Sequence, residues 1–161
     1  MRIRTSNDDI GLVGIWTIKV HNLKSGKTIA LVEKKKNLVI LAGRNLVRDF
    51  LYGDAVSGLT HMAVGTNTVS PTTDTSIGEV FRKTFTSKTK TNGQLTIDLY
   101  LASGEANGYT LSAVALFGNG ATGTAGSGTQ YNKLIHTGAQ AITKTSSIAV
   151  TYTCELYFNA G

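Results

Sequence analysis

Alternation of apolar and polar residues predicts β-strands along most of the chain. In residues 12–22, Trp16, Ile18 and Val20 occupy every second position, so they share one face of a strand. Residues 147–158 alternate in the same way. Further strand patterns span residues 27–35, 60–64, 80–90, 94–102, 109–117 and 131–136. About eight strands separated by turn residues predict a mainly β fold, either a β-sandwich or a jelly-roll-like barrel.

One segment follows the period of a helix instead. Between Gly43 and Gly53 the apolar residues recur at helical spacing rather than at every second position. Glycine is favoured just after the last turn of a helix, which suits Gly53. We therefore expect one short helix over residues 44–52. Its apolar face would consist of Leu46, Val47, Phe50 and Leu51.

The domain organisation follows from length and pattern. A chain of 161 residues fits one domain. Residues 1–10 are polar, charged and without period, so we expect an N-terminal arm followed by a single β domain over residues 11–161. Cys154 is the only cysteine, which excludes an internal disulfide, and its apolar strand face indicates a small core residue.

Membrane attachment is not expected. No apolar stretch approaches the ~20 residues that a membrane span needs. Arg2 and Arg4 are followed by Asp8 and Asp9 before the first apolar run, whereas a signal peptide has its apolar core directly after the basic residues. We expect a soluble protein made in a cytoplasm.

The positive charge is concentrated near the N-terminus. The net charge is +6, and residues 1–50 hold ten Lys and Arg against four Asp and Glu, which is the whole excess. Such a surface fits an acidic protein, nucleic acid, or a solvated edge that deters sheet aggregation. Nucleic acid is less favoured, because Trp16 is the only aromatic residue before Phe50. The candidate assembly residues are Arg2, Arg4, Lys34, Lys35, Lys36, Arg44 and Arg48.

Motifs for catalysis or cofactor binding are weak. Residues 25–28 read S-G-K-T, but the full phosphate-binding pattern needs a glycine where His21 stands and a helix where a strand pattern follows. Residues 118–123 match a dinucleotide fingerprint by letters only. The three histidines lie far apart in the sequence. We therefore predict no catalytic residue, no metal site and no cofactor, and we do not expect an enzyme.

A carbohydrate- or receptor-binding module remains an alternative to a purely structural protein. Such a module would expose aromatic side chains on loops. Residues 118–128 are rich in Gly, Ala, Thr and Ser and predict a flexible loop. The candidate outward-facing residues are Tyr52, Tyr109, Asn119, Thr122 and Tyr131.

Three groups of turn motifs resemble those of small bacteriophage virion proteins. H-M-A-V-G-T at residues 61–66, followed by E-V-F-R at 79–82, is similar to a strand end that leads through a Thr/Pro loop to an L-x-x-E-x-x-R segment. E-A-N-G at 105–108 with L-F-G at 116–118 resembles a later E-x-N-G … L-F element. N-L-V at 37–39 with A-G-R-N at 42–45 resembles the run before a short helix. Asn67 and Val114 depart from the pattern, which often has a glycine and an acid there.

The resemblance implies a virion structural protein that forms a homo-oligomer, with a trimer favoured. It favours a capsid decoration protein, which would bind the major capsid protein of the head shell through its arm and basic N-terminal third. The alternative is a tail, baseplate or fibre-tip protein, with a receptor- or carbohydrate-binding role, because the family's members are placed on heads, tails and fibres alike.

Overall fold

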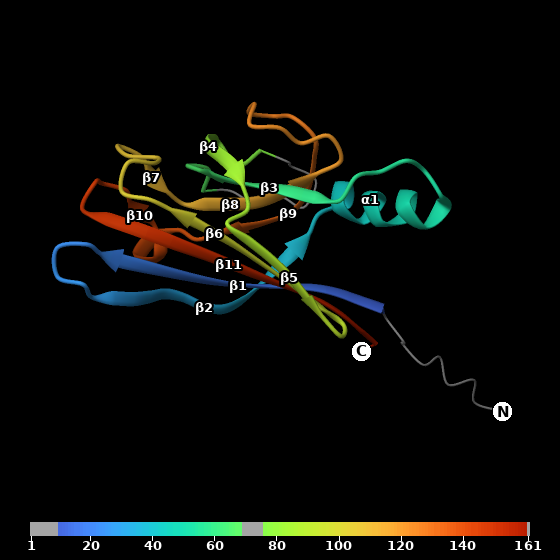
Figure 1. Cartoon of the computed structure of the whole chain (residues 1–161), viewed down its shortest axis with the longest axis horizontal. Coiled ribbons are helices and arrows are strands. Elements are labelled where there is room, and N and C mark those ends of the chain that lie inside the picture. The colour runs from blue at the N-terminus through green and yellow to red at the C-terminus, as the bar shows by residue number, and fades with distance from the viewer. Residues whose placement is uncertain (1–9, 69–75, 161) are drawn as a thin grey trace.

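The computed structural model describes residues 10–68 and 76–160, which form a mainly β fold with one α-helix (Figure 1). The helix is α1 (Leu41–Tyr52), and a single turn of 3-10 helix, η1, spans Gly138–Gln140. The strands are β1 (Ile10–Asn22), β2 (Thr28–Val39), β3 (Leu59–Gly65), β4 (Glu79–Thr84), β5 (Ser87–Thr91), β6 (Gln94–Leu101), β7 (Thr110–Leu111), β8 (Ala113–Gly118), β9 (Thr129–Ile135), β10 (Ile142–Thr143) and β11 (Ile148–Ala160).

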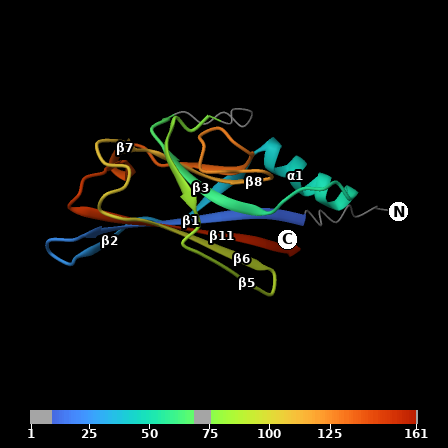
Figure 2. The same ribbon diagram turned by 45° about the horizontal axis from the view of Figure 1, so that its top comes forward.

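The strands form two antiparallel layers, which confirms the predicted β-sandwich. One layer has the order β2-β1-β11-β6-β5 and the other has the order β4-β3-β8-β9, while β7 and β10 form a separate pair. In Figure 2 the layer with β3 and β8 lies above the layer with β1, β11 and β6. Strand β2 belongs to both layers, because residues 28–37 pair with β1 and residues 38–39 pair with β9.

The chain also crosses between the layers from β4 to β5, which are the outermost strands of the two layers. Only Phe85 and Thr86 separate β4 from β5. The Phe85 N–H donates to the Thr60 carbonyl of β3 at 3.3 Å, and the Thr86 N–H donates to the Asp98 carbonyl of β6 at 2.8 Å. The strand predicted over residues 80–90 is therefore one extended run that changes layer, and the sandwich approaches a flattened barrel.

The core lies between the layers and follows the predicted alternation. Trp16, Ile18 and Tyr152 are completely buried, and so is Cys154, as expected for a core residue. Burial raises the pKa of the Cys154 thiol well above its usual range. The strand β8 is buried along its whole length, so it is covered on both faces. The strand predicted over residues 109–117 is interrupted at Ser112, however, so that β7 and β8 join different pairs.

The helix was predicted correctly in type and in its C-terminal end. Gly53 has φ 99°, and its N–H donates to the Asp49 and Phe50 carbonyls at 3.1 and 3.2 Å. The N-terminal end was wrong, because α1 begins at Leu41 and includes Gly43. A Cβ atom at Gly43 would overlap the Tyr131 carbonyl of β9, so this glycine allows the first turn to lie directly on that strand.

The structure bears only in part on the predicted N-terminal arm and on the expected absence of a membrane span. Most of the expected arm, residues 1–9, lies outside the described residues, whereas Ile10 already pairs with Ala160 as the first residue of β1. Within the described residues, no helix is both long enough and apolar enough to cross a membrane.

Candidate protein-interaction site

The main candidate site is an apolar groove between α1 and the end of the sandwich. Its volume is about 440 Å³. Residues of α1 line one part of it, residues of β6 and β11 line another, and one residue of β9 also contributes. The residues that define this groove are Leu46, Val47, Phe50 and Leu51 of α1, Leu95 of β6, Leu156 and Phe158 of β11, and Tyr131 of β9.

The second half of α1 is much more exposed than its apolar pattern predicts. Leu46 is buried and Val47 half-buried, but Phe50 is 67% exposed and Leu51 is 77% exposed. Tyr52 follows at 84%. We call Phe50, Leu51 and Tyr52 the apolar ridge. Isolated exposed apolar residues are normal, but Phe50 and Leu51 also line the groove, and together with its other apolar residues they form a larger patch of the kind that marks an interaction surface.

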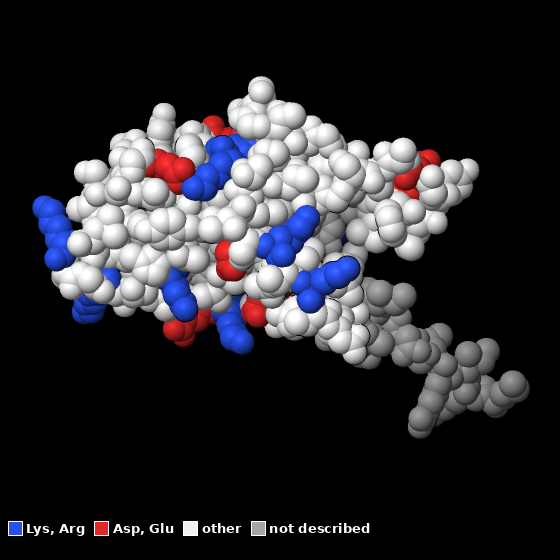
Figure 3. Space-filling model, viewed as in Figure 1, with Lys and Arg blue, Asp and Glu red and all other residues white. Residues whose placement is uncertain are grey.

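Charged residues border the groove without entering it. Lys90 of β5 lies directly across the strand pair from Leu95, and Asp54 follows the end of α1. Arg48 and Asp49 form an exposed ion pair on the helix. Figure 3 shows the helix end projecting from the body as a mostly uncharged surface that carries a small acidic patch.

The candidate basic residues are distributed over several elements. Arg44 and Arg48 are exposed on α1, and Lys34, Lys35 and Lys36 are exposed on β2, whereas Arg2 and Arg4 lie outside the described residues. Lys34 has φ 46° at an irregularity in the β1–β2 pairing. The charged edge of β2 is of the kind that deters pairing with another sheet.

Lys35 also has a structural contact. Its ammonium group donates to the Ile135 carbonyl at the end of β9 and to the Gln140 side-chain oxygen, both at 3.2 Å. It therefore links β2 to the segment after β9, beyond the short stretch where the two strands pair.

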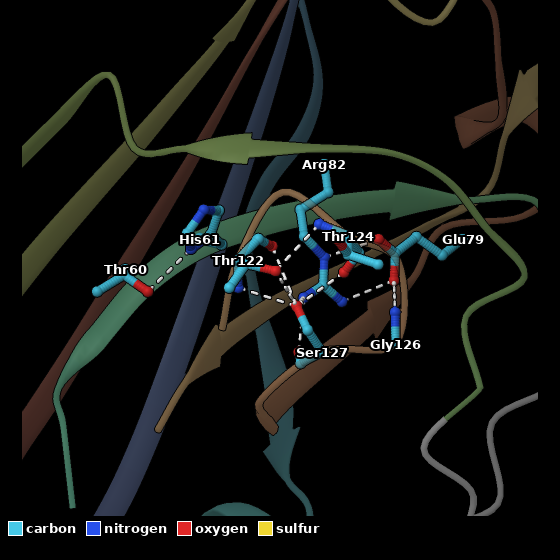
Figure 4. Close-up of polar contacts among 8 residues, drawn as sticks. All are labelled: Thr60, His61, Glu79, Arg82, Thr122, Thr124, Gly126 and Ser127. Atoms are coloured by element: carbon cyan, nitrogen blue, oxygen red, sulfur yellow. Dashed lines mark hydrogen bonds and ion pairs between the residues drawn. The ribbon is translucent and has the colours of Figure 1, made fainter. Parts of the chain in front are cut away.

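A second candidate site surrounds Arg82, a nearly buried residue of β4 (Figure 4). Its guanidinium group makes two hydrogen bonds of 2.7 Å to the Glu79 carboxylate and one of 2.7 Å to the Ser127 carbonyl. It also lies 3.9 Å from the centre of the Phe117 ring. This arrangement satisfies a charged group that would otherwise be costly to bury.

The Glu79–Arg82 pair depends on an irregularity in β4. Residues three apart in a regular strand point to opposite faces. Here Gly65 pairs with Glu79 and Val64 with Phe81, so Val80 is an extra residue in β4. Such a bulge changes the direction of the following side chains and lets Arg82 reach Glu79.

Side-chain hydrogen bonds close the loop over residues 118–128, which the sequence predicted as a flexible loop. The Ser127 hydroxyl donates to the Thr124 carbonyl at 2.7 Å and accepts from the Thr122 N–H at 2.9 Å. The Gly126 N–H donates to Glu79 at 3.3 Å. The sequence alone did not reveal these contacts, because Glu79 and Arg82 lie about 45 residues away.

The candidate outward-facing residues divide into two groups. Tyr52, Tyr109, Asn119 and Thr122 are exposed. Tyr131 is not, because it belongs to β9, is only 4% exposed and contributes to the lining of the groove, so its prediction as an outward loop residue was wrong. Burial, with a smaller effect of Cys154, raises the pKa of Tyr131 to about 12.

The E-A-N-G motif forms a fixed turn. Glu105 accepts hydrogen bonds from the Lys83 ammonium group at 2.7 Å and from the Ala102 N–H at 2.8 Å. Asn107 accepts from the buried Lys144 ammonium group at 3.0 Å. Burial raises the pKa of Glu105, but the Lys83 and Ala102 hydrogen bonds outweigh it, so the pKa is lowered overall. Burial lowers the pKa of Lys144, and Glu105 opposes that shift.

The histidines occupy separate places in the structure. His21 lies between the Thr28 and Thr151 hydroxyls, at 2.8 Å from each. His136 is buried, and its Nδ1 donates to the Gln140 carbonyl at 2.9 Å. Burial lowers the pKa of His136 and also that of His61, where Arg82 adds to the effect. Within residues 10–68 and 76–160, no three His, Cys, Asp or Glu side chains gather as metal ligands would.

These features define a β-sandwich with an apolar groove at its helical end and an anchored loop on one layer. No protein-family model, curated protein or solved structure matches this chain. Its function therefore has to be argued from its surfaces and motifs.

Proposed function

We propose that this chain is a structural protein of a bacteriophage virion that acts by binding other virion proteins as a homo-oligomer, with a trimer favoured. The observation that carries the proposal is the exposed apolar ridge beside the groove, because such a surface is stabilised by contact with another protein. The turn motifs that resemble virion proteins support the same class.

The proposed location is the head shell, as a capsid decoration protein that binds the major capsid protein. The basic residues of the first third would steer the protein to an acidic shell, since complementary charge mainly accelerates association and sets orientation. An oligomer would engage several shell sites at once, so that modest individual contacts add up to firm attachment.

A tail, baseplate or fibre-tip protein with a receptor- or carbohydrate-binding role is the second candidate. The loop over residues 118–128 favours it, because Arg82 and Glu79 hold that loop while Asn119 and Thr122 remain exposed on it. A fixed loop with exposed polar groups suits recognition, since little entropy is lost when it binds.

Immunogold electron microscopy of the phage whose genome encodes this chain tests the proposal. Label on intact heads supports a decoration protein, label on tails or fibres supports the second candidate, and unlabelled purified particles contradict a virion role. Purified protein should also rebind stripped heads less strongly as NaCl is raised from 0.1 to 1 M, because the Debye length falls from about 10 Å to about 3 Å. Binding that does not depend on salt would show that the basic residues are not responsible.

A further inference from the structure

We propose that the groove is filled by the apolar ridge of a second copy of this chain, which makes the helical end the self-association surface. The proposal deepens the oligomeric function proposed above and rests on it. Its first support is geometry: Phe50 and Leu51 belong both to the groove lining and to the apolar ridge, so a single apolar surface combines a hollow with exposed side chains. Two copies can therefore present complementary surfaces to each other.

The exposed area is sufficient for such an interface. Phe50, Leu51 and Tyr52, together with the half-exposed Phe158, leave roughly 550 Å² of side-chain surface accessible, taking about 200 Å² for each fully exposed large side chain. Two copies would bury about 1,100 Å² in total, which exceeds the roughly 1,000 Å² expected of a biological interface.

Other occupants explain the surface less well. A small apolar ligand could fill about 440 Å³, but it would leave Tyr52 exposed. Residues 1–9 of the chain contain only two large apolar residues, Met1 and Ile3, which are too few to cover the groove and the ridge together.

Sedimentation equilibrium of the full chain tests the proposal. The unmodified protein should form a defined oligomer, and Leu51→Lys should raise its dissociation constant about 30-fold or more, as expected for a central interface residue. Tyr109→Lys is the matched control, because it changes an exposed aromatic residue that does not line the groove, and it should leave the association unchanged. Circular dichroism should show the same β signal for all three proteins.

A cross-linking experiment tests the contact directly. Chains with Tyr52→Cys are mixed with chains with Leu95→Cys under mild oxidation, and a disulfide between different copies is expected because the ridge of one copy would lie in the groove of the other. The native Cys154 is buried and should remain unreacted. The control mixture pairs Tyr109→Cys chains with Leu95→Cys chains and should give no cross-link.

Several results would overturn the inference. In sedimentation, these are a monomer at all concentrations, an oligomer that Leu51→Lys leaves intact, or an oligomer that is lost on deletion of residues 2–9 but not on Leu51→Lys. In cross-linking, it is the absence of a disulfide between Tyr52→Cys and Leu95→Cys chains. In native mass spectrometry, it is an apolar ligand bound in the groove. An oligomer that forms through the ridge but is absent from virions would refute the proposed function while leaving the self-association surface standing.

Discussion

Replacing Arg82 by methionine should destabilise the protein strongly and release the loop over residues 118–128. Methionine keeps much of the apolar stem but removes the guanidinium group. The Arg82 side chain is only 1% exposed and that of Glu79 only 12%. Without Arg82, the Glu79 carboxylate would remain mostly buried, and within residues 10–68 and 76–160 its remaining donor is the Gly126 N–H at 3.3 Å.

The magnitude follows from the loss of one partner of a buried ion pair. Such a loss typically costs about 3–5 kcal/mol, since the remaining charge is left without compensation. Domains of this size are stable by about 5–15 kcal/mol, so the expected effect is a large fraction of the total. With a slope of about 2 kcal/mol per M in urea, the unfolding midpoint of Arg82→Met should fall by about 2 M.

Urea unfolding can be followed through Trp16, the only tryptophan and a fully buried one. The double variant Glu79→Gln/Arg82→Met removes both charges and should be more stable than Arg82→Met alone. Arg48→Met is the matched control, because the Arg48 side chain is 68% exposed in its ion pair and should contribute less than about 1 kcal/mol. Limited proteolysis should cut residues 118–128 faster only when Arg82 is replaced.

The reasoning would be refuted if Arg82→Met cost no more than Arg48→Met. It would also be refuted if the double variant were as unstable as the sum of its two single variants, because the charges would then not act as a pair.

Three further changes test other parts of the structure. The free energy of unfolding should be level above pH 6.5 and fall as the pH drops below it, because burial lowers the pKa of His136 and the unfolded chain then binds a proton that the folded chain does not. In His136→Asn, the difference between the free energies of unfolding at pH 7.5 and pH 5.5, measured by chemical unfolding, should be smaller. An unchanged difference would assign the pH dependence to another group. Gly43→Ala should cost about 1–3 kcal/mol in thermal unfolding, since its methyl group would overlap the Tyr131 carbonyl, and a stabilised variant would show that α1 can move without cost. Asn107→Ala should cost about 1–3 kcal/mol in urea unfolding, because the buried Lys144 ammonium group loses an acceptor, and a loss below about 0.5 kcal/mol would mean that water replaces the amide.

The sequence predicted the strands whose two faces differ most clearly. Through the middle of β1, β6 and β11 every second residue is buried, as the alternation predicts, and these residues include Trp16, Leu99 and Tyr152. The turn between β5 and β6 is formed by Asn92-Gly93, a dipeptide typical of hairpins, and Gly93 has a positive φ of 71°. These features depend on local geometry, which the sequence encodes directly.

The order of the strands and the position of Arg82 could not be predicted in this way. Strand β1 pairs with β11, about 130 residues away, and no local pattern specifies that partner. Glu79 and Arg82 are three residues apart, a spacing that brings side chains together on a helix but separates them on a regular strand. Only the bulge at Val80 makes their contact possible, and a bulge is a property of the paired strands rather than of the residue pattern.

The helix shows why a correctly predicted apolar face can still be left uncovered. The spacing of Leu46, Val47, Phe50 and Leu51 indicates that these residues share a face, but it does not specify what covers that face. The close approach of Gly43 to Tyr131 fixes the first turn on β9, and a helix of 12 residues extends about 18 Å, so its second half projects beyond that contact. Burying a large apolar side chain contributes about 1.5–3 kcal/mol, and the isolated chain gains little of this from Phe50 and Leu51. Covering these residues with the groove of a second copy would make that free energy available for association.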